Sequence, residues 1–244
     1  MSIPEKAAER GVPSLVWRAG QERRLAMIRA AAGDRLTGGY ILDVGCGIGT
    51  YLSALRAYTP FTFGVEIEGK YAREAAAHSH IVQAMAEQLP FTDNCFDLVL
   101  SHEVIEHVAD DRTCVMDMVR VLKPGGRLVL FCPNRLYPFE THGHYWRGTY
   151  HFGNTPLVNY LPDRIRNRLV PHVRAYTVRG LRQLLKGLPI RILTHSQVYP
   201  GYDNLVARNP ALGRIVRWLS YRLERTPMRL LGLSHFLVVE KIAT

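Results

Sequence analysis

A glycine-rich turn at residues 41–50, ILDVGCGIGT, carries the residue types best suited to holding a ligand. An apolar run, expected to be a strand buried on both faces, ends at Asp43 and Val44 and is followed by glycines. Glycines permit a tight turn and let a ligand approach the main chain at the start of a helix. The spacing is GxGxG, whereas dinucleotide-binding turns typically have GxGxxG. The turn therefore predicts a ligand site at the end of this strand.

A second acidic residue, Glu66, ends the next apolar segment in Gly64-Val65-Glu66. A carboxylate at this place can accept hydrogen bonds from both hydroxyls of a ribose. The alternative is a solvated glutamate at a strand end, which the neighbouring glycine-rich turn makes the weaker interpretation.

Apolar runs and helical patterns alternate along the rest of the chain. The expected strands cover 40–44, 61–66, 80–84, 96–101, 127–132, 190–199 and 235–242, and the expected helices cover 14–32 (capped by Ser14), 49–58, 70–77, 110–122, 177–186 (capped by Thr177) and 209–231, with a break at Pro227. A turn is expected at 123–126. This alternation predicts a parallel sheet covered by helices on both faces.

Four segments, in the same order and with the same spacing, resemble the motifs of a known family. They are ILDVGCGIGTY, GVEIEGKY, AEQLPFTDNCFDLVLSHEVIEHV and RVLKPGGRLVLFCPN, within about residues 38–134. They look like the successive motifs of class I S-adenosylmethionine (SAM)-dependent methyltransferases, similar to the ubiquinone-biosynthesis O-methyltransferases. The resemblance implies a doubly wound, Rossmann-like α/β fold, with a seven-stranded, mostly parallel sheet and an antiparallel C-terminal strand.

The same resemblance implies SAM as the cofactor and a role for each matching residue. The glycine turn lies beneath the methionine part of SAM, Glu66 holds the ribose, and Ile67 lies against the adenine. The implied cofactor-binding residues are Asp43, Gly45, Cys46, Gly47, Glu66, Ile67, Met85, Ala86, Glu87, Ser101 and His102. Met85 stands where many relatives carry an Asp that binds the adenine amino group, so backbone and apolar contacts are expected to replace that bond.

His107 is the candidate catalytic residue, because it follows the strand end that faces the cofactor. An imidazole there can take a proton from an acceptor hydroxyl. The alternative is a histidine that caps or packs the following helix. The Asn/Asp-Pro-Pro-aromatic motif of DNA base methylation is absent after this strand, which reads Ser101-His102-Glu103-Val104.

Residues 133–176 are predicted to form a lid over the acceptor, because rings and polar anchors are dense there. The candidate substrate residues are Asn134, Arg135, Tyr137, His142, His144 and Trp146. Glu140, His142 and His144 are also metal-ligand types, but their spacing is loose. We therefore expect no metal.

The charge of +10 is concentrated in the second part of the chain. Residues 135–244 carry 17 Lys and Arg against 5 Asp and Glu. Arginines alternate with apolar residues over 208–231, which predicts a basic amphipathic helix. Such a helix can lie on an anionic membrane, or it can cover the sheet edge with its arginines solvated.

We expect a single domain over 1–244, with an N-terminal helical cap at 1–37, the lid at 133–176 and a basic helical insertion at 201–233. No apolar run reaches 18 residues, the start lacks a secretory signal, and the four cysteines show no metal-ligand spacing. These features indicate a cytoplasmic protein with reduced thiols.

The predicted function is methyl transfer from SAM, most simply to oxygen, on a small-molecule or lipid-linked acceptor. Three alternatives are a nicotinamide-dependent oxidoreductase, an RNA methyltransferase and a non-catalytic SAM-binding protein. The glycine spacing disfavours the first, and no RNA-binding module is recognised, so nucleic acid is not the expected partner.

Overall fold

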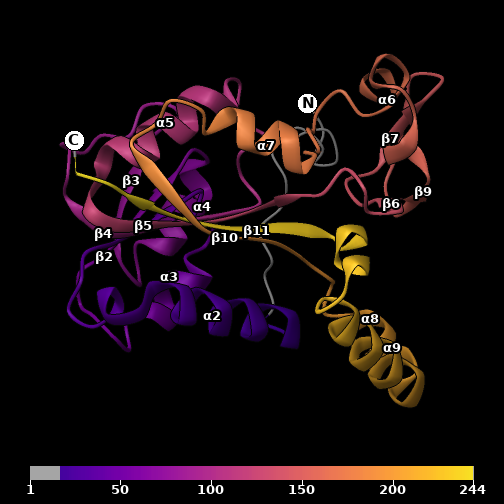
Figure 1. Ribbon diagram of the computed structural model, residues 1–244, viewed down its shortest axis with the longest axis horizontal. Coiled ribbons are helices and arrows are strands. Elements are labelled where there is room, and N and C mark those ends of the chain that lie inside the picture. The colour runs from indigo at the N-terminus through magenta and orange to yellow at the C-terminus, as the bar shows by residue number, and fades with distance from the viewer. Residues whose placement is uncertain (1–16, 244) are drawn as a thin grey trace.

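A seven-stranded sheet runs through the part of the chain that the structure, a computed structural model, describes, residues 17–243 (Figure 1). Its spatial order is β3-β2-β1-β4-β5-β11-β10. The bounds are β1 Ile41–Val44, β2 Thr62–Glu66, β3 His80–Gln83, β4 Phe96–His102, β5 Leu122–Pro133, β10 Ile190–Val198 and β11 Ser234–Lys241. Strands β1 to β5 are parallel, and β11 lies antiparallel between β5 and β10. The predicted sheet, including its antiparallel C-terminal strand, is confirmed.

Helices cover both faces of this sheet, as the alternating pattern predicts. The bounds are α2 Ala19–Ala32, α3 Thr50–Leu55, α4 Gly69–Ala75, α5 Asp111–Val121, α6 Asp163–Leu169, α7 Val178–Leu184, α8 Asp203–Arg208 and α9 Pro210–Leu223, with 3-10 turns at Gly33–Leu36, Val158–Tyr160 and Pro227–Leu231. Helices α2 and α3 share one apolar core with the sheet, and α5 and α7 share another on the opposite face. Burial on both faces explains the continuous apolar run of β1, whose four residues are all buried.

Helix α2 begins later than predicted, at Ala19. Ser14 and Leu15 lie outside the described residues, but Arg18 is extended and is the N-cap residue. The side chain of Gln21 accepts a hydrogen bond from the Arg18 N–H, and Asp203 accepts one from the Gly20 N–H at 3.1 Å. A distant carboxylate thus satisfies a backbone group at the start of the helix, which the local sequence does not reveal.

Two further elements follow the predictions with some difference in detail. Residues 123–126 lie within the bounds of β5 but pair with no residue of β4, since the register moves from Phe96–Leu122 to Leu98–Arg127; with Gly125 at φ +79°, the predicted turn is a bulge of the strand. The predicted basic helix at 209–231 is interrupted before Pro227, as expected: α9 ends at Leu223, and a 3-10 turn begins at Pro227. Asn209 caps α9 by accepting from the Leu212 N–H, so α8 ends just before it.

The predicted lid follows β5 and has its own small architecture (Figure 1). Two short antiparallel pairs form it, β6 Phe139–Glu140 with β9 Thr155–Pro156 and β7 His144–Trp146 with β8 Thr149–His151. Val158, Val170 and Val173 make a separate apolar cluster. An ion pair of 2.9 Å between the buried side chains of Arg166 and Glu140 joins α6 to β6.

Asn134 fastens the start of this lid to the C-terminal part of the chain. Its Nδ2 donates to the carbonyls of Leu230 and Gly232 at 2.8 and 2.7 Å, and its Oδ1 accepts from the Leu136 N–H at 3.2 Å. We expect Asn134→Ala to lower the free energy of unfolding by about 2–3 kcal/mol, because it leaves buried carbonyls without donors. Urea unfolding followed by circular dichroism measures this. The exposed Asn154→Ala is the control, and equal loss in both variants would contradict the assignment.

Candidate functional site

A pocket of about 490 Å³ lies at the carboxyl ends of the central parallel strands. This edge is where open α/β sheets bind ligands. The lining residues are Gly45, Gly47, Val65, Glu66, Ile67, Glu68, Tyr71, Ala84, Met85, Ala86, Glu87, His102, Glu103, Val104, His107, Val108 and Ala109. The fold therefore brings together the ends of β1, β2 and β4 and the segment after β3.

The glycine turn forms one wall of the pocket. Gly45, Gly47 and Gly49 have φ of +73°, +55° and +80°, a region that side-chain-bearing residues rarely adopt. Gly45 also lacks room for a side chain, because a Cβ there would lie 2.4 Å from Cγ2 of Val104. The main-chain atoms of Gly45 and Gly47 therefore line the pocket without side chains over them.

The carboxylate of Glu66 connects this turn to the end of β2. Its Oε2 accepts a hydrogen bond from the Gly47 N–H, and its Oε1 accepts one from the Glu68 N–H, both at 2.9 Å. Only 7% of the residue is exposed, and the side chain lines the pocket. Glu66 is therefore fixed in place before any ligand arrives.

Three of the predicted cofactor residues lie behind the pocket wall and do not line it. Asp43, Cys46 and Ser101 are all buried. Burial, followed by the negative charge of Glu66, raises the pKa of Asp43 to about 8. Asp43 is buried and lies next to the glycine turn in the sequence, and direct contact of these three residues with a ligand stays a prediction.

Further lining of the pocket comes from the residues after β2 and after β3. Ile67, Met85 and Ala86 supply apolar surface, with Met85 49% exposed. Glu87 lines the pocket as well, but its Oε1 accepts from the Ala109 N–H at 2.8 Å. This hydrogen bond therefore connects the loop after β3, which contains Glu87, to the loop after β4, which contains Ala109.

His102 reaches the pocket from β4 and is kept neutral. Burial, then the positive charge of Arg24, lowers the pKa of His102 to about 3. Arg24 also donates to Glu103 Oε1 and Ser234 Oγ, both at 2.9 Å. Although burial alone would raise it, the pKa of Glu103 is lowered to about 2 because of Arg24 and the other positive and hydrogen-bonding groups around it. Arg24 is thus a positioning residue that the sequence analysis missed.

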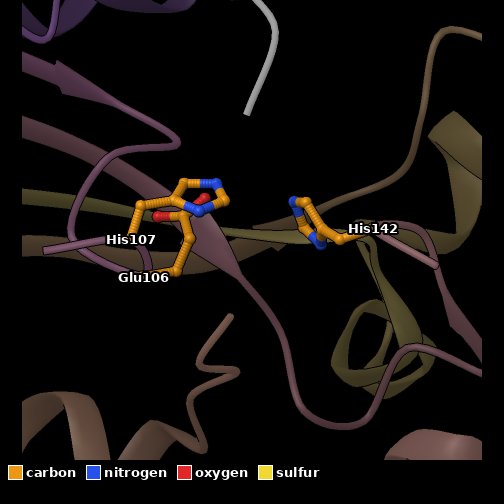
Figure 2. Close-up of side chains that lie close together, drawn as sticks. All are labelled: Glu106, His107 and His142. Carbon is orange, nitrogen blue, oxygen red and sulfur yellow. The ribbon is translucent and has the colours of Figure 1, made fainter. Parts of the chain in front are cut away.

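His107 meets a lid residue at the edge of the pocket (Figure 2). Its ring centroid is 5.5 Å from that of His142, and the two rings are nearly perpendicular. Glu106 lies beside them, and one ligand atom from each of the three side chains falls within 4.8 Å of the others. Burial raises the pKa of Glu106 well above its usual range, and the charge of Glu103 adds to this effect.

Most of the other predicted substrate residues form hydrogen bonds within the protein, in or next to the lid. Asn134 holds the chain as described above, and Arg135 donates to the Leu161 carbonyl at 2.7 Å and to Asp163 at 2.9 Å. His144 bonds to Thr155 and stacks on His151. All three are engaged within the protein, and their predicted contact with substrate stays a prediction; of the lid candidates, His142 is the one that lies close to Glu106 and His107.

The two remaining substrate candidates lie apart from that cluster. Trp146 is 55% exposed on β7, and no ring among residues 17–243 contacts it. Tyr137 is half-buried, and burial raises its pKa to about 12. Contact of either residue with an acceptor stays a prediction.

Several lining residues were not predicted. Glu68 and Tyr71 follow β2, and Val104, Val108 and Ala109 follow β4. Their positions just after the predicted strand ends are a signal that was present in the sequence. By contrast, no described residue of α2 lines the pocket, and residues 1–16 of the predicted N-terminal cap lie outside the described residues.

Known proteins resemble this chain in both sequence and fold. Residues 42–130 match a family of methyltransferase domains. An uncharacterized methyltransferase of Mycolicibacterium vanbaalenii is 35% identical over 143 residues, which are 55% of this chain and 56% of that protein. A ubiquinone biosynthesis O-methyltransferase of Maricaulis maris is 32% identical over 146 residues, 53% and 56% of the two chains. A SAM-dependent methyltransferase structure from Mesorhizobium loti has a TM-score of 0.62 at 16% identity, over 91% of this chain and 98% of that one.

Residues 42–130 therefore form a methyltransferase domain, the solved structure shares the fold of the chain, and the predicted resemblance to class I SAM-dependent methyltransferases is confirmed. The cofactor of this class is SAM. The chain spans about half the length of the curated relatives it matches. The pocket fits the cofactor, because an uncovered glycine backbone and a prepositioned carboxylate hydrogen-bonded to it lie together beside a mostly apolar space.

The buried Asp43 predicts a pH-dependent stability. Its pKa is about 8 in the folded protein, against 3.8 ordinarily, so the folded state binds the proton more tightly. The contribution of Asp43 to the free energy of unfolding therefore falls as pH rises from about 4 to 8, by at most about 1.4 kcal/mol per pH unit. We expect Asp43→Asn to flatten this decline in urea titrations, while the exposed Asp34→Asn leaves it unchanged. A wild-type slope in Asp43→Asn would contradict the prediction.

Proposed function

We propose that the protein transfers a methyl group from SAM to an oxygen of a small-molecule acceptor that enters beneath the lid. The observation that carries the proposal is the pocket itself, which places the glycine turn and Glu66 on one side and the His107–His142 approach on the other. The similarity to a ubiquinone biosynthesis O-methyltransferase supports oxygen as the accepting atom.

Each pocket residue has a place in this reaction. Gly45, Gly47 and Glu66 would hold the aminoacyl and ribose parts of SAM, while Ile67 and Met85 would lie against the adenine. When bound, SAM supplies a methyl group on a positively charged sulfur, ready for in-line displacement. Alignment of the acceptor by the lid then contributes much of the rate. Removal of the acceptor proton falls to His107 and its neighbours Glu106 and His142.

The cofactor assignment predicts a specific loss on changing Glu66. We expect Glu66→Ala to weaken SAM binding about ten- to hundredfold, because a prepositioned acceptor for the ribose hydroxyls is lost. Isothermal titration with SAM and S-adenosylhomocysteine measures this, with circular dichroism to check folding. The exposed Glu74→Ala on α4 is the matched control. Equal SAM affinity in wild type and Glu66→Ala, or protection by NADH in place of SAM, would contradict the assignment.

The accepting molecule is tested by activity on a panel of hydroxyl compounds. Release of S-adenosylhomocysteine is measured with phenols, catechols, polyprenyl phenols and glycolipids. Methylation of one of these classes supports the proposal. SAM binding without turnover on any acceptor favours a non-catalytic SAM-binding protein, and turnover with RNA favours the RNA methyltransferase alternative.

A second feature favours an acceptor that resides in a membrane. Helices α8 and α9 extend away from the sheet (Figure 1). They approach closely, since a Cβ on Gly213 would lie 2.5 Å from the Cα of Val206. The outer face of α9 is apolar and exposed, and consists of Leu212, Ile215, Trp218, Leu219 and Leu223. Arg214, Arg222 and Arg225 are exposed beside it.

An apolar stripe flanked by arginines is the pattern of a helix that lies in the surface of an anionic membrane. No helix within residues 17–243 is long and apolar enough to cross a membrane. We therefore assign the exposed face of α9 to peripheral contact with anionic lipid, which would bring the pocket near lipid-linked acceptors.

The membrane contact predicts binding to vesicles of defined charge. We expect the protein to co-sediment with phosphatidylglycerol vesicles but not with phosphatidylcholine vesicles, and binding to weaken as salt screens the arginines. The double variant Ile215→Ser/Trp218→Ser should lose most of this binding, because the inserted apolar area is removed. Phe152→Ser, which changes an 86% exposed residue of the lid, is the control. Equal binding by both variants would contradict the assignment.

A further inference from the structure

Three side chains from two distant parts of the chain converge (Figure 2), and one of them, His107, lines the pocket. Glu106 and His107 follow β4, whereas His142 lies in the lid between β6 and β7. One ligand atom from each lies within 4.8 Å of the other two. A transition-metal ion with bonds of about 2.0–2.2 Å needs ligand atoms roughly 3–4 Å apart. A lid movement of about an ångström would therefore complete the geometry.

The carboxylate of Glu106 is an independent indication of a missing positive partner. Glu106 is 1% exposed, and neither of its oxygens accepts a hydrogen bond from a described residue. A buried carboxyl group without a hydrogen-bond partner is costly even when it is neutral, and each such group in a folded protein requires a physical reason. A bound cation supplies one.

The ring of His142 is held by a second carboxylate. Its Nδ1 lies 3.0 Å from Oε1 of Glu140, which also accepts from the His142 backbone N–H at 3.0 Å. Glu140 is in turn fixed by Arg166 at 2.9 Å. Metal-binding histidines commonly donate one ring N–H to a carboxylate, which fixes the other nitrogen toward the metal. The arrangement leaves Nε2 of His142 as the nitrogen available to a ligand.

We propose that Glu106, His107 and His142 bind one divalent transition-metal ion beside the pocket. Two imidazoles and one carboxylate are the ligand set of catalytic zinc sites and of open manganese or iron sites, whereas calcium and magnesium prefer oxygen ligands alone. His107 also lines the pocket, so the open coordination positions face the acceptor.

This site revises two expectations from the sequence. No metal was expected, and the ligand set considered there combined Glu140, His142 and His144. In the structure only His142 belongs to the cluster, since Glu140 orients its ring and His144 bonds to Thr155. The ligands Glu106 and His107 come from outside the lid.

The role of the ion rests on the proposed methyl transfer, but the site itself does not. With the ion bound, the three side chains are its ligands and no longer take the acceptor proton themselves. An acceptor hydroxyl held by the ion would be more acidic and would release its proton to solvent water. The oxygen then forms a bond to the methyl carbon, while the bond from that carbon to sulfur breaks and its electron pair stays on sulfur. The products are the methyl ether, a neutral thioether and one proton.

Metal binding is measured directly on the full chain after removal of metals with EDTA. Titration calorimetry with ZnCl₂ and with MnCl₂, and elemental analysis after dialysis, should show one ion per chain. We expect Glu106→Gln and His142→Ala each to weaken binding by more than tenfold, and Glu140→Gln to weaken it about ten- to hundredfold. His144→Ala, a lid histidine outside the cluster, should bind as wild type does.

Two further measurements distinguish loss of metal binding from misfolding, and failure of the metal site from failure of the proposed function. The visible spectrum of the cobalt-loaded protein should report histidine ligation in wild type and change in His142→Ala. SAM titration of Glu106→Gln should match wild type, which shows that the variant is folded. No metal bound by wild type, or wild-type affinity for the metal in Glu106→Gln and His142→Ala, overturns the site. Metal binding without methyl transfer to any acceptor would refute only the proposed function.

Discussion

The pocket depends on one carboxylate that is fixed before any ligand arrives. Glu66 accepts a backbone N–H from the glycine turn after β1 and another from the residue that begins the segment after β2. Because β1 and β2 are adjacent parallel strands, their carboxyl ends lie at the same edge of the sheet. The two hydrogen bonds therefore set both the shape of the turn and the position of the carboxylate that faces the ligand. Arg24 likewise fixes side chains at the end of β4, where it contacts His102, Glu103 and Ser234.

The sequence predicted the parts of this arrangement that depend on short stretches of chain. The glycine turn, Glu66 and the seven strands follow from local patterns, because a buried parallel strand is apolar throughout and a tight turn requires glycine. Arg24 could not be predicted in the same way, and His142, although its residue type made it a candidate, could not be placed beside His107 from the sequence. Each reaches the site from an element far away in the chain, and an arginine on a helix or a histidine in a loop has no local pattern that distinguishes it from a solvated one.

The differences between predicted and observed element boundaries also arise from contacts between residues that are distant in the sequence. Helix α2 starts at Ala19 where Asp203 receives a backbone N–H, and residues 123–126 stay in β5 because the strand bulges against β4. In the lid, Asn134 and Arg135 have the residue types of a substrate site but bind carbonyls of the protein itself. The excess of arginine in the second part of the chain is likewise partly structural, since Arg166 donates to the Val173 carbonyl and Arg174 to those of Val108 and Ala109.

The apolar cluster of Val158, Val170 and Val173 gives the lid a core that is separate from those of the sheet. A segment with its own core opens and closes as a cooperative unit, with a free energy smaller than that of global unfolding. Substitutions within such a unit leave the packing around the sheet untouched. The family match ends at residue 130, before the lid begins. The choice of acceptor can therefore diverge between relatives by exchange of this one module, while the cofactor half of the molecule keeps its stability and its chemistry.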